Sequence, residues 1–232
     1  MLIHDFTEAV DPLPYNDDLN PKLWEGDSLI PEIRLQLMRI ARHFADFLNV
    51  ERLNLKDVTI SGSNAAYGYS DSSDLDLHLI VDVDSPEKVE LYDAKKNQYN
   101  NSYNITIKDI DVELYVQDSK QSHYSAGIYS VLNNEWLVKP KREEPQVTHQ
   151  EVKSKARGYA GRINLALKSK NLEVAKNTMA DLRRLRKAGL ERAGEFSVEN
   201  LAFKLLRARG QIDKLSKMIK RLESEKLSLG EQ

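Results

Sequence analysis

The segment SGSNAAYGYSDSSDLDLHLIVD, residues 61–82, constrains the fold of this chain more than any other. From its middle onward, leucines alternate with Asp74, Asp76 and His78. Alternation with a period of two predicts a half-buried strand that packs one side on a core. Asp74 and Asp76 then share the other side, where two like charges repel each other and need a positive partner. The segment therefore predicts a sheet that carries a paired-carboxylate site.

The pattern around this strand predicts further strands and helices. Helices are expected where proline follows a capping position and apolar residues recur at helical spacing. Strands are expected where β-branched and polar residues alternate. The expected elements are a helix from Pro31, strands over 57–63, 74–82 and 105–118, a helix from Pro86, and a hairpin that turns at Asn133-Asn134.

The pattern changes after Pro140, where strand-like alternation gives way to helical periodicity. Helices are expected over residues 148–169, 171–193 and 197–226. Residues 1–30 contain several prolines and show no periodicity, which favours an extended arm. The expected organisation is an N-terminal arm over 1–30, an α+β domain over 31–140 and a basic α-helical domain over 145–232.

Charge is distributed unevenly along the chain. Acidic residues outnumber basic ones by about two to one in residues 1–138, and the ratio reverses in residues 139–232. The chain has no cysteine, which excludes disulfides and fits a reducing compartment. Its N-terminal residues lack the features of a secretion signal, and no apolar run is long enough to cross a bilayer. A cytoplasmic protein with no membrane partner is therefore expected.

A second strand supplies further carboxylates. Asp111 and Glu113 lie on the polar side of the strand expected over 105–118. Together with Asp74 and Asp76 they form a set of oxygen ligands from two strands, which Mg²⁺ prefers and commonly shares with substrate phosphates. Two such ions close together activate an attacking hydroxyl and stabilise a departing pyrophosphate. The carboxylates predict a site for Mg²⁺ or Mn²⁺, whereas His78 is expected to be a polar neighbour of that site.

Gly62 and Ser63 stand at the turn before the carboxylate strand. Glycine allows the backbone to approach a phosphate closely, and a short helix after Ser63 would direct amide N–H groups toward it. The pair therefore predicts contacts to the triphosphate of an NTP.

Residues 60–79 resemble the signature of the DNA polymerase β-like nucleotidyltransferase superfamily. That signature is a hydrophobic residue, Gly-Ser, a spacer, and then Asp-hydrophobic-Asp-hydrophobic. GSNAAYGYSDSSDLDL is especially similar to the form in noncanonical poly(A) polymerases and terminal uridylyltransferases, with Gly68 and Ser73-Asp74 at the matching positions. The chain also resembles predicted nucleotidyltransferases of tailed phages, whose tails are similar to GLERAGEFSVENLAFKLLR; such a protein would lie in the host cytoplasm.

The resemblance implies a palm, which is a small mixed sheet flanked by helices, and transfer of a nucleoside monophosphate from an NTP to an acceptor hydroxyl with release of pyrophosphate. It implies that Asp74 and Asp76 bind both metal ions and that the third carboxylate is Asp111, slightly favoured over Glu113. It adds Ser73 to the nucleotide contacts. An RNA 3′ end is the first expectation for the acceptor; a protein or small-molecule hydroxyl, or a non-catalytic binding protein on the same fold, are the alternatives.

Basic residues follow the expected tail helices. Such helices can neutralise RNA phosphates, although an ordinary solvated amphipathic helix explains the pattern as well. The candidate nucleic-acid contacts are Arg183, Arg184, Arg186, Lys187, Lys204 and Arg207.

Overall fold

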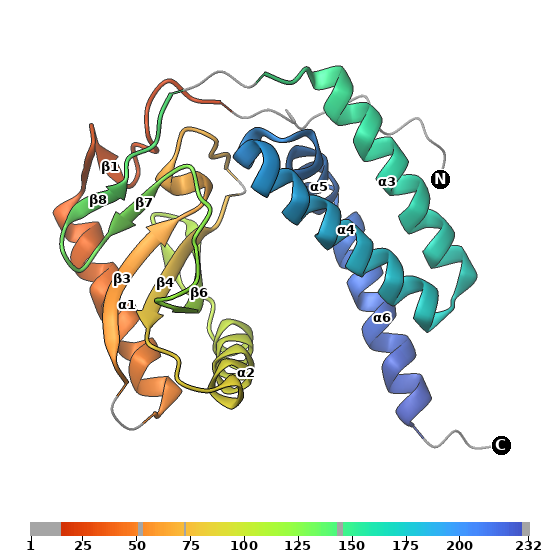
Figure 1. The fold of residues 1–232 in the computed structure, drawn as a ribbon, viewed down its shortest axis with the longest axis horizontal. Coiled ribbons are helices and arrows are strands. Elements are labelled where there is room, and N and C mark those ends of the chain that lie inside the picture. The colour runs from red at the N-terminus through yellow and green to blue at the C-terminus, as the bar shows by residue number, and fades with distance from the viewer. Residues whose placement is uncertain (1–14, 51–52, 72, 143–145, 229–232) are drawn as a thin grey trace. The chain divides into compact units, whose positions relative to one another are not determined.

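The computed structural model describes residues 15–50, 53–71, 73–142 and 146–228 (Figure 1). The described residues up to 142 belong to one compact unit and those from 146 onward to another. The first unit combines a small mixed sheet with flanking helices, and the second is entirely helical. The expected fold class, α+β followed by an α-helical region, is confirmed. Within the described part of the chain, no helix is both long and apolar enough to cross a membrane.

A six-stranded mixed sheet forms the centre of the first unit (Figure 1). Its strands lie in the order β5 (Thr106–Ile107), β6 (Ile110–Asp118), β4 (Leu75–Val81), β3 (Leu55–Ser61), β7 (Ile128–Ser130) and β8 (Glu135–Val138). β4 runs parallel to β6, and every other pair of neighbours is antiparallel. The carboxylate strand β4 therefore lies inside the sheet, between β6 and β3.

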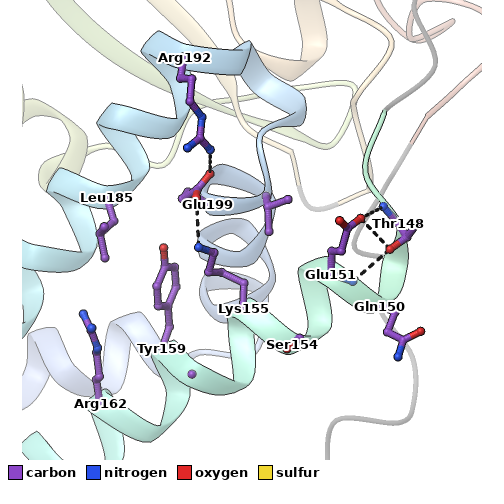
Figure 2. Close-up of a pocket in the computed structure, with 12 residues that line it drawn as sticks. Thr148, Gln150, Glu151, Ser154, Lys155, Tyr159, Arg162, Leu185, Arg192 and Glu199 are labelled. Carbon is purple, nitrogen blue, oxygen red and sulfur yellow. Dashed lines mark hydrogen bonds and ion pairs between the residues drawn. The ribbon is translucent and has the colours of Figure 1, made fainter.

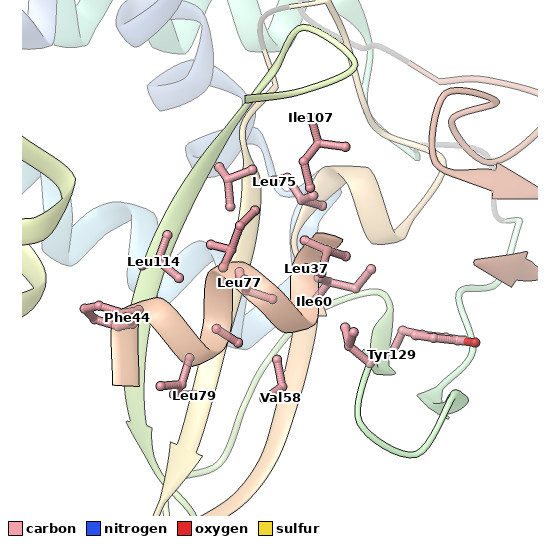
Figure 3. Packing of buried hydrophobic residues seen from close by; sticks show 14 of the residues in the cluster. Leu37, Phe44, Val58, Ile60, Leu75, Leu77, Leu79, Ile107, Leu114 and Tyr129 are labelled. Carbon is pink, nitrogen blue, oxygen red and sulfur yellow. The ribbon is translucent and has the colours of Figure 1, made fainter. Parts of the chain in front are cut away.

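The apolar side of this sheet packs against helices α1 (Pro31–Leu48) and α2 (Pro86–Ser102). Burial alternates strictly along β4, because its leucines point into the core while the residues between them are only partly buried. Figure 3 shows Leu37 and Phe44 of α1 beside the leucines of β4 and Leu114 of β6. The helix starts expected at Pro31 and Pro86 are confirmed, and the packing leaves the polar side of β4 for the candidate site.

The strand expected over residues 105–118 is a hairpin instead. β5 and β6 pair as antiparallel strands, and Lys108 and Asp109 form the turn between them with φ angles of 50° and 64°. A two-residue turn of this kind needs positive φ at both positions. The sequence Lys-Asp lacks the glycine that usually marks such a turn. The alternation of apolar and polar residues continues through Lys108 and Asp109, so the sequence pattern predicted a single strand.

Part of the N-terminal region belongs to the core of the first unit. Leu19, Leu23, Trp24 and Leu29 are buried in the same cluster as the sheet residues. Trp24 and Leu29 face each other in a short antiparallel pair, β1 (Trp24–Glu25) with β2 (Ser28–Leu29). Residues 1–14 of the expected arm lie outside the described residues.

Four helices and one short 3₁₀ turn make up the described part of the second unit. They are α3 (His149–Ser169), α4 (Leu172–Ala193), η3 (Gly194–Phe196), α5 (Val198–Ala208) and α6 (Gln211–Leu227). The single helix expected over 197–226 is wrong: it divides at Gly210, which adopts a φ of 66° that an α-helix does not accommodate. The continuous apolar stripe on both sides of this glycine concealed the break.

A charged cluster joins three helices of the second unit (Figure 2). Glu199 of α5 accepts a hydrogen bond from Arg192 of α4 at 2.7 Å and forms an ion pair with Lys155 of α3 at 3.1 Å. These residues line an open groove of about 910 Å³ together with Tyr159 and Arg162. Glu199 engages both Lys155 and Arg192, so the cluster joins the three helices.

The Glu199 cluster makes the stability of the second unit depend on pH. Burial raises the pKa of Glu199, but hydrogen bonds from its backbone amide, Lys155 and Arg192 outweigh burial and hold the pKa below the usual 4.5. The folded carboxylate thus binds a proton less readily than the unfolded one. Its contribution is present above about pH 4.5 and is lost as the pH falls through the folded pKa.

We expect Glu199→Gln to lower the thermal stability near neutral pH, and the gap to wild type to narrow as the solution is acidified. Circular dichroism melts over a pH series measure this gap. Glu223→Gln is the matched control, because Glu223 forms an exposed ion pair with Lys176 and such pairs contribute little. A Glu199→Gln gap that stays constant down to acid pH would contradict the role given to the carboxylate.

Candidate functional site

Gly62 lies directly beside the side chain of Asp76. Ser61, the last residue of β3, pairs with Asp76 of β4, so the turn that begins at Gly62 passes directly beside the Asp76 side chain. Gly62 has a φ of 78°, and a Cβ atom at this position would lie 2.2 Å from Oδ2 of Asp76. Its backbone N–H donates to Oγ of Ser125 at 3.1 Å. Only glycine fits here, both for backbone conformation and for space.

The loop between the turn and β4 is held by its own hydrogen bonds. A single 3₁₀ turn, η2 (Ser63–Ala65), follows Gly62. This turn corresponds to the short helix that was expected after Ser63. Oγ of Ser73 accepts from the backbone N–H of Ser70 at 2.9 Å. Ser63 and Ser73 are both half-buried, and these two predicted nucleotide contacts lie near the two ends of the loop.

The candidate carboxylates occupy two neighbouring levels of the sheet. Asp76 of β4 pairs directly with Glu113 of the parallel strand β6. Leu75 pairs with Val112, so Asp74 and Asp111 stand at the preceding level. Side chains of paired residues lie on the same face, so Asp76, Glu113 and Asp111 emerge on one side of the sheet, and Asp74 directly precedes the first residue of β4. Glu113 is half-buried, whereas Asp111 is exposed.

The chemistry of this set fits a hard divalent cation, because every donor is a carboxylate oxygen. Gly62 has no side chain, so the turn leaves room for the Asp76 carboxylate beside its backbone, which also fits a metal site. As the side chains lie, however, no three Asp, Glu, His or Cys residues of the described chain come together as a metal-ligand set. The residues that would hold Mg²⁺ or Mn²⁺ are Asp74 and Asp76, with Asp111 or Glu113 as the third.

His78 continues the polar side of β4 beyond Asp76. Its Nε2 is 3.0 Å from Oγ of Ser61, and its ring stacks on Tyr115 with centroids 4.9 Å apart. Burial, together with the nearby ring of His123, lowers the pKa of His78 to about 3. A histidine that stays neutral and bonds to Ser61 packs beside the site as a polar neighbour and does not offer a positive charge to a phosphate.

Two asparagines that were not predicted lie next to the candidate ligands. Asn64 is fully buried and donates to the carbonyl oxygens of Ser73 and Asp74, at 3.0 and 2.8 Å. Asn20 of the N-terminal segment donates to Asn64 at 2.8 Å. The position of Asn64 immediately after Gly62-Ser63 was a usable signal. Nothing in the pattern of the sequence connects Asn20 to the loop.

The basic residues predicted to contact nucleic acid do not share one environment. Arg183, Arg184 and Lys187 are exposed on α4, and Arg207 is exposed on α5. Arg184 forms an ion pair with Asp181 at 2.7 Å.

Arg186 and Lys204 are half-buried. Nε of Arg186 donates to Oδ1 of the buried Asn200 at 2.9 Å, and its guanidinium lies 5.0 Å from the centre of the Phe203 ring. Arg186 therefore supports the packing of α4 against α5.

No protein-family model matches the chain, and no curated protein matches it. Among solved structures, the chain is similar to the STING-associated CdnE c-di-GMP synthase from Capnocytophaga granulosa. The two share 14% sequence identity over 85% of this chain and 83% of that chain, with a TM-score of 0.26.

Proposed function

We propose that the protein is a metal-dependent nucleotidyltransferase that moves a nucleoside monophosphate from an NTP to an acceptor hydroxyl and releases pyrophosphate. The contact between Gly62 and Asp76 carries this proposal. It joins a glycine turn, suited to a phosphate, to a strand carboxylate, suited to the metal ion that accompanies that phosphate. The sequence of residues 60–79, with its resemblance to the polymerase β-like superfamily, supports the same function.

The residues of the site divide into metal ligands and phosphate contacts. Asp74 and Asp76 hold the metal ions, and Gly62, Ser63 and Ser73 hold the phosphates of the NTP. Two Mg²⁺ ions, when bound, would promote attack by the acceptor hydroxyl and stabilise the leaving pyrophosphate. Because Ser61 of β3 pairs with Asp76, the turn that begins at Gly62 brings the phosphate contacts next to a metal ligand.

The third carboxylate is Asp111 or Glu113. Pairing with Asp76 and partial burial favour Glu113, whereas the match to the superfamily pattern favours Asp111. Asp111→Asn and Glu113→Gln separate the two, because removal of a direct ligand should cost more than about a hundredfold in transfer rate, above the effect of a second-sphere change. The residue whose variant retains near-normal transfer is not the ligand.

For the acceptor, we propose an RNA 3′ end, on the resemblance of the Gly-Ser segment to RNA-tailing enzymes and on the basic tail. The packing of Arg186 against Asn200 and Phe203 favours the second candidate, a protein or small-molecule hydroxyl, because this half-buried guanidinium serves the contact between α4 and α5.

Thermal unfolding with Mg²⁺ and each of the four NTPs tests the nucleotide site. A catalytic site should be stabilised most when metal and nucleotide are present together, by about 2.7 kcal/mol at a ligand concentration one hundred times Kd. Stabilisation by an RNA oligonucleotide without metal would instead indicate a non-catalytic binding protein. Asp76→Asn should remove the effect of Mg²⁺ with NTP.

A further inference from the structure

Asn64 connects the two ends of the loop that carries the candidate site. It directly follows Gly62-Ser63, and its side chain is fully buried. The two N–H groups of its amide donate to the carbonyl oxygens of Ser73 and Asp74, at 3.0 and 2.8 Å. These bonds fix the backbone of Asp74, whose carboxylate is a candidate metal ligand.

The N-terminal segment in turn fixes Asn64. Nδ2 of Asn20 donates to Oδ1 of Asn64, and Nε1 of Trp24 donates to the Asn64 carbonyl oxygen, both at 2.8 Å. Asn20 is 6% exposed, and its backbone carbonyl oxygen accepts a hydrogen bond from the backbone N–H of Trp24 at 2.9 Å. Trp24 stacks on Trp136 with ring centroids 4.7 Å apart. The Asn64 amide is thus bonded through both its oxygen and its nitrogen, while Trp24 holds the Asn64 backbone.

The same segment binds the middle of the loop. The backbone N–H of Asn16 donates to the carbonyl oxygen of Tyr67 at 2.8 Å, and its side-chain amide donates to the carbonyl oxygens of Tyr67 and Tyr69, at 3.1 and 2.8 Å. Residues 16–24 therefore contact the loop at its start, its middle and, through Asn64, its end.

We propose that Asn64 is a positioning residue for Asp74, and that Asn20 orients Asn64 for this task. The inference rests on the proposed function, because it takes Asp74 to be a ligand of a hard divalent cation. Groups that hydrogen-bond to a ligand residue orient it, and their loss typically costs about ten- to a hundredfold in metal affinity. Without the Asn64 amide, the carbonyl oxygens of Ser73 and Asp74 lose their buried donor and the start of β4 loses its fixed position.

Three variants of the full chain test the proposal. Asn64→Leu keeps a similar volume but removes both donors. Asn20→Ala leaves Asn64 in place and removes the amide that orients it, together with the bond that Asn20 accepts from the Lys22 N–H at 3.0 Å. Ser130→Ala is the matched control: Ser130 is also fully buried, and it makes two hydrogen bonds, to Asp57 and from Asn133. It should cost stability without touching the loop.

The measurements are Mn²⁺ affinity, from the electron paramagnetic resonance signal of unbound Mn²⁺, and hydrogen exchange of the peptide that spans residues 70–77. We expect Asn64→Leu to weaken Mn²⁺ binding about ten- to a hundredfold and Asn20→Ala to weaken it less, with faster exchange in both variants. Ser130→Ala should leave both readouts at the wild-type value. If Asn64→Leu does not fold, Asn20→Ala decides the outcome.

The possible failures are distinguishable. If wild type binds Mn²⁺ and the folded variants bind it with equal affinity, the positioning role is overturned and the proposed function stands. If wild type binds no Mn²⁺, the proposed function is overturned, and the positioning role with it.

Discussion

Asp76→Asn is expected to abolish nucleotidyl transfer while the fold remains intact. Asparagine keeps the shape of the side chain beside the Gly62 turn but removes the charge that a divalent cation requires. The transfer rate should fall by more than about a hundredfold, because removal of a group that only hydrogen-bonds to a metal ligand already has an effect of up to that size. Because the substitution also removes the repulsion between Asp74 and Asp76, the metal-free variant should be at least as stable as wild type.

Rates of NTP-dependent label transfer and denaturant unfolding measure the two parts of this prediction. Asp82→Asn is the matched control, because Asp82 follows the far end of β4 and forms an ion pair with Lys56 at 2.9 Å. It should transfer at the wild-type rate. An Asp76→Asn variant that is folded and transfers at a near-normal rate would show that Asp76 is not a metal ligand.

Gly62→Ala should cause the largest combined loss of stability and metal binding. The backbone of Gly62 lies in a region that is open essentially only to glycine, and another residue there costs on the order of 1–3 kcal/mol. The added Cβ atom would also lie 2.2 Å from Oδ2 of Asp76, so the carboxylate must move. We expect reduced stability in denaturant together with a loss of Mn²⁺ affinity of at least about tenfold.

Gly26→Ala separates the two causes. Gly26 also has a positive φ, 58°, but a Cβ atom there would have nothing within 4 Å. This variant should show the backbone cost, about 1–2 kcal/mol, with unchanged Mn²⁺ affinity. Equal Mn²⁺ affinity in Gly62→Ala and wild type would refute the view that the turn is built around the Asp76 carboxylate.

Local patterns were sufficient to predict most of the first unit. Alternation located β4, proline and capping residues located α1 and α2, and Asn133-Asn134 located the hairpin between β7 and β8. Two boundaries were missed for a shared reason: the apolar pattern runs without interruption across the Lys108-Asp109 turn and across Gly210, while the backbone reverses or breaks there.

The candidate site was only partly accessible from the sequence. Gly62, Asp74 and Asp76 belong to one short motif whose spacing and residue types carry their chemistry. Asn20 and Trp24, by contrast, bond to Asn64 from 44 and 40 positions away in the sequence, and contacts at that separation leave no periodic signal. The register that pairs Asp76 with Glu113 depends on where β6 begins, which the missed turn at residues 108–109 obscured.

The central claim is tested most directly by label transfer from four separate α-³²P NTPs, with Mg²⁺ or Mn²⁺, to total cellular RNA and lysate protein. We predict metal-dependent label in RNA from one preferred NTP with wild type and none with Asp76→Asn. Label in protein or small molecules would support the second acceptor class. No label in any fraction, from a folded protein shown to bind NTP and metal, would contradict the proposed activity.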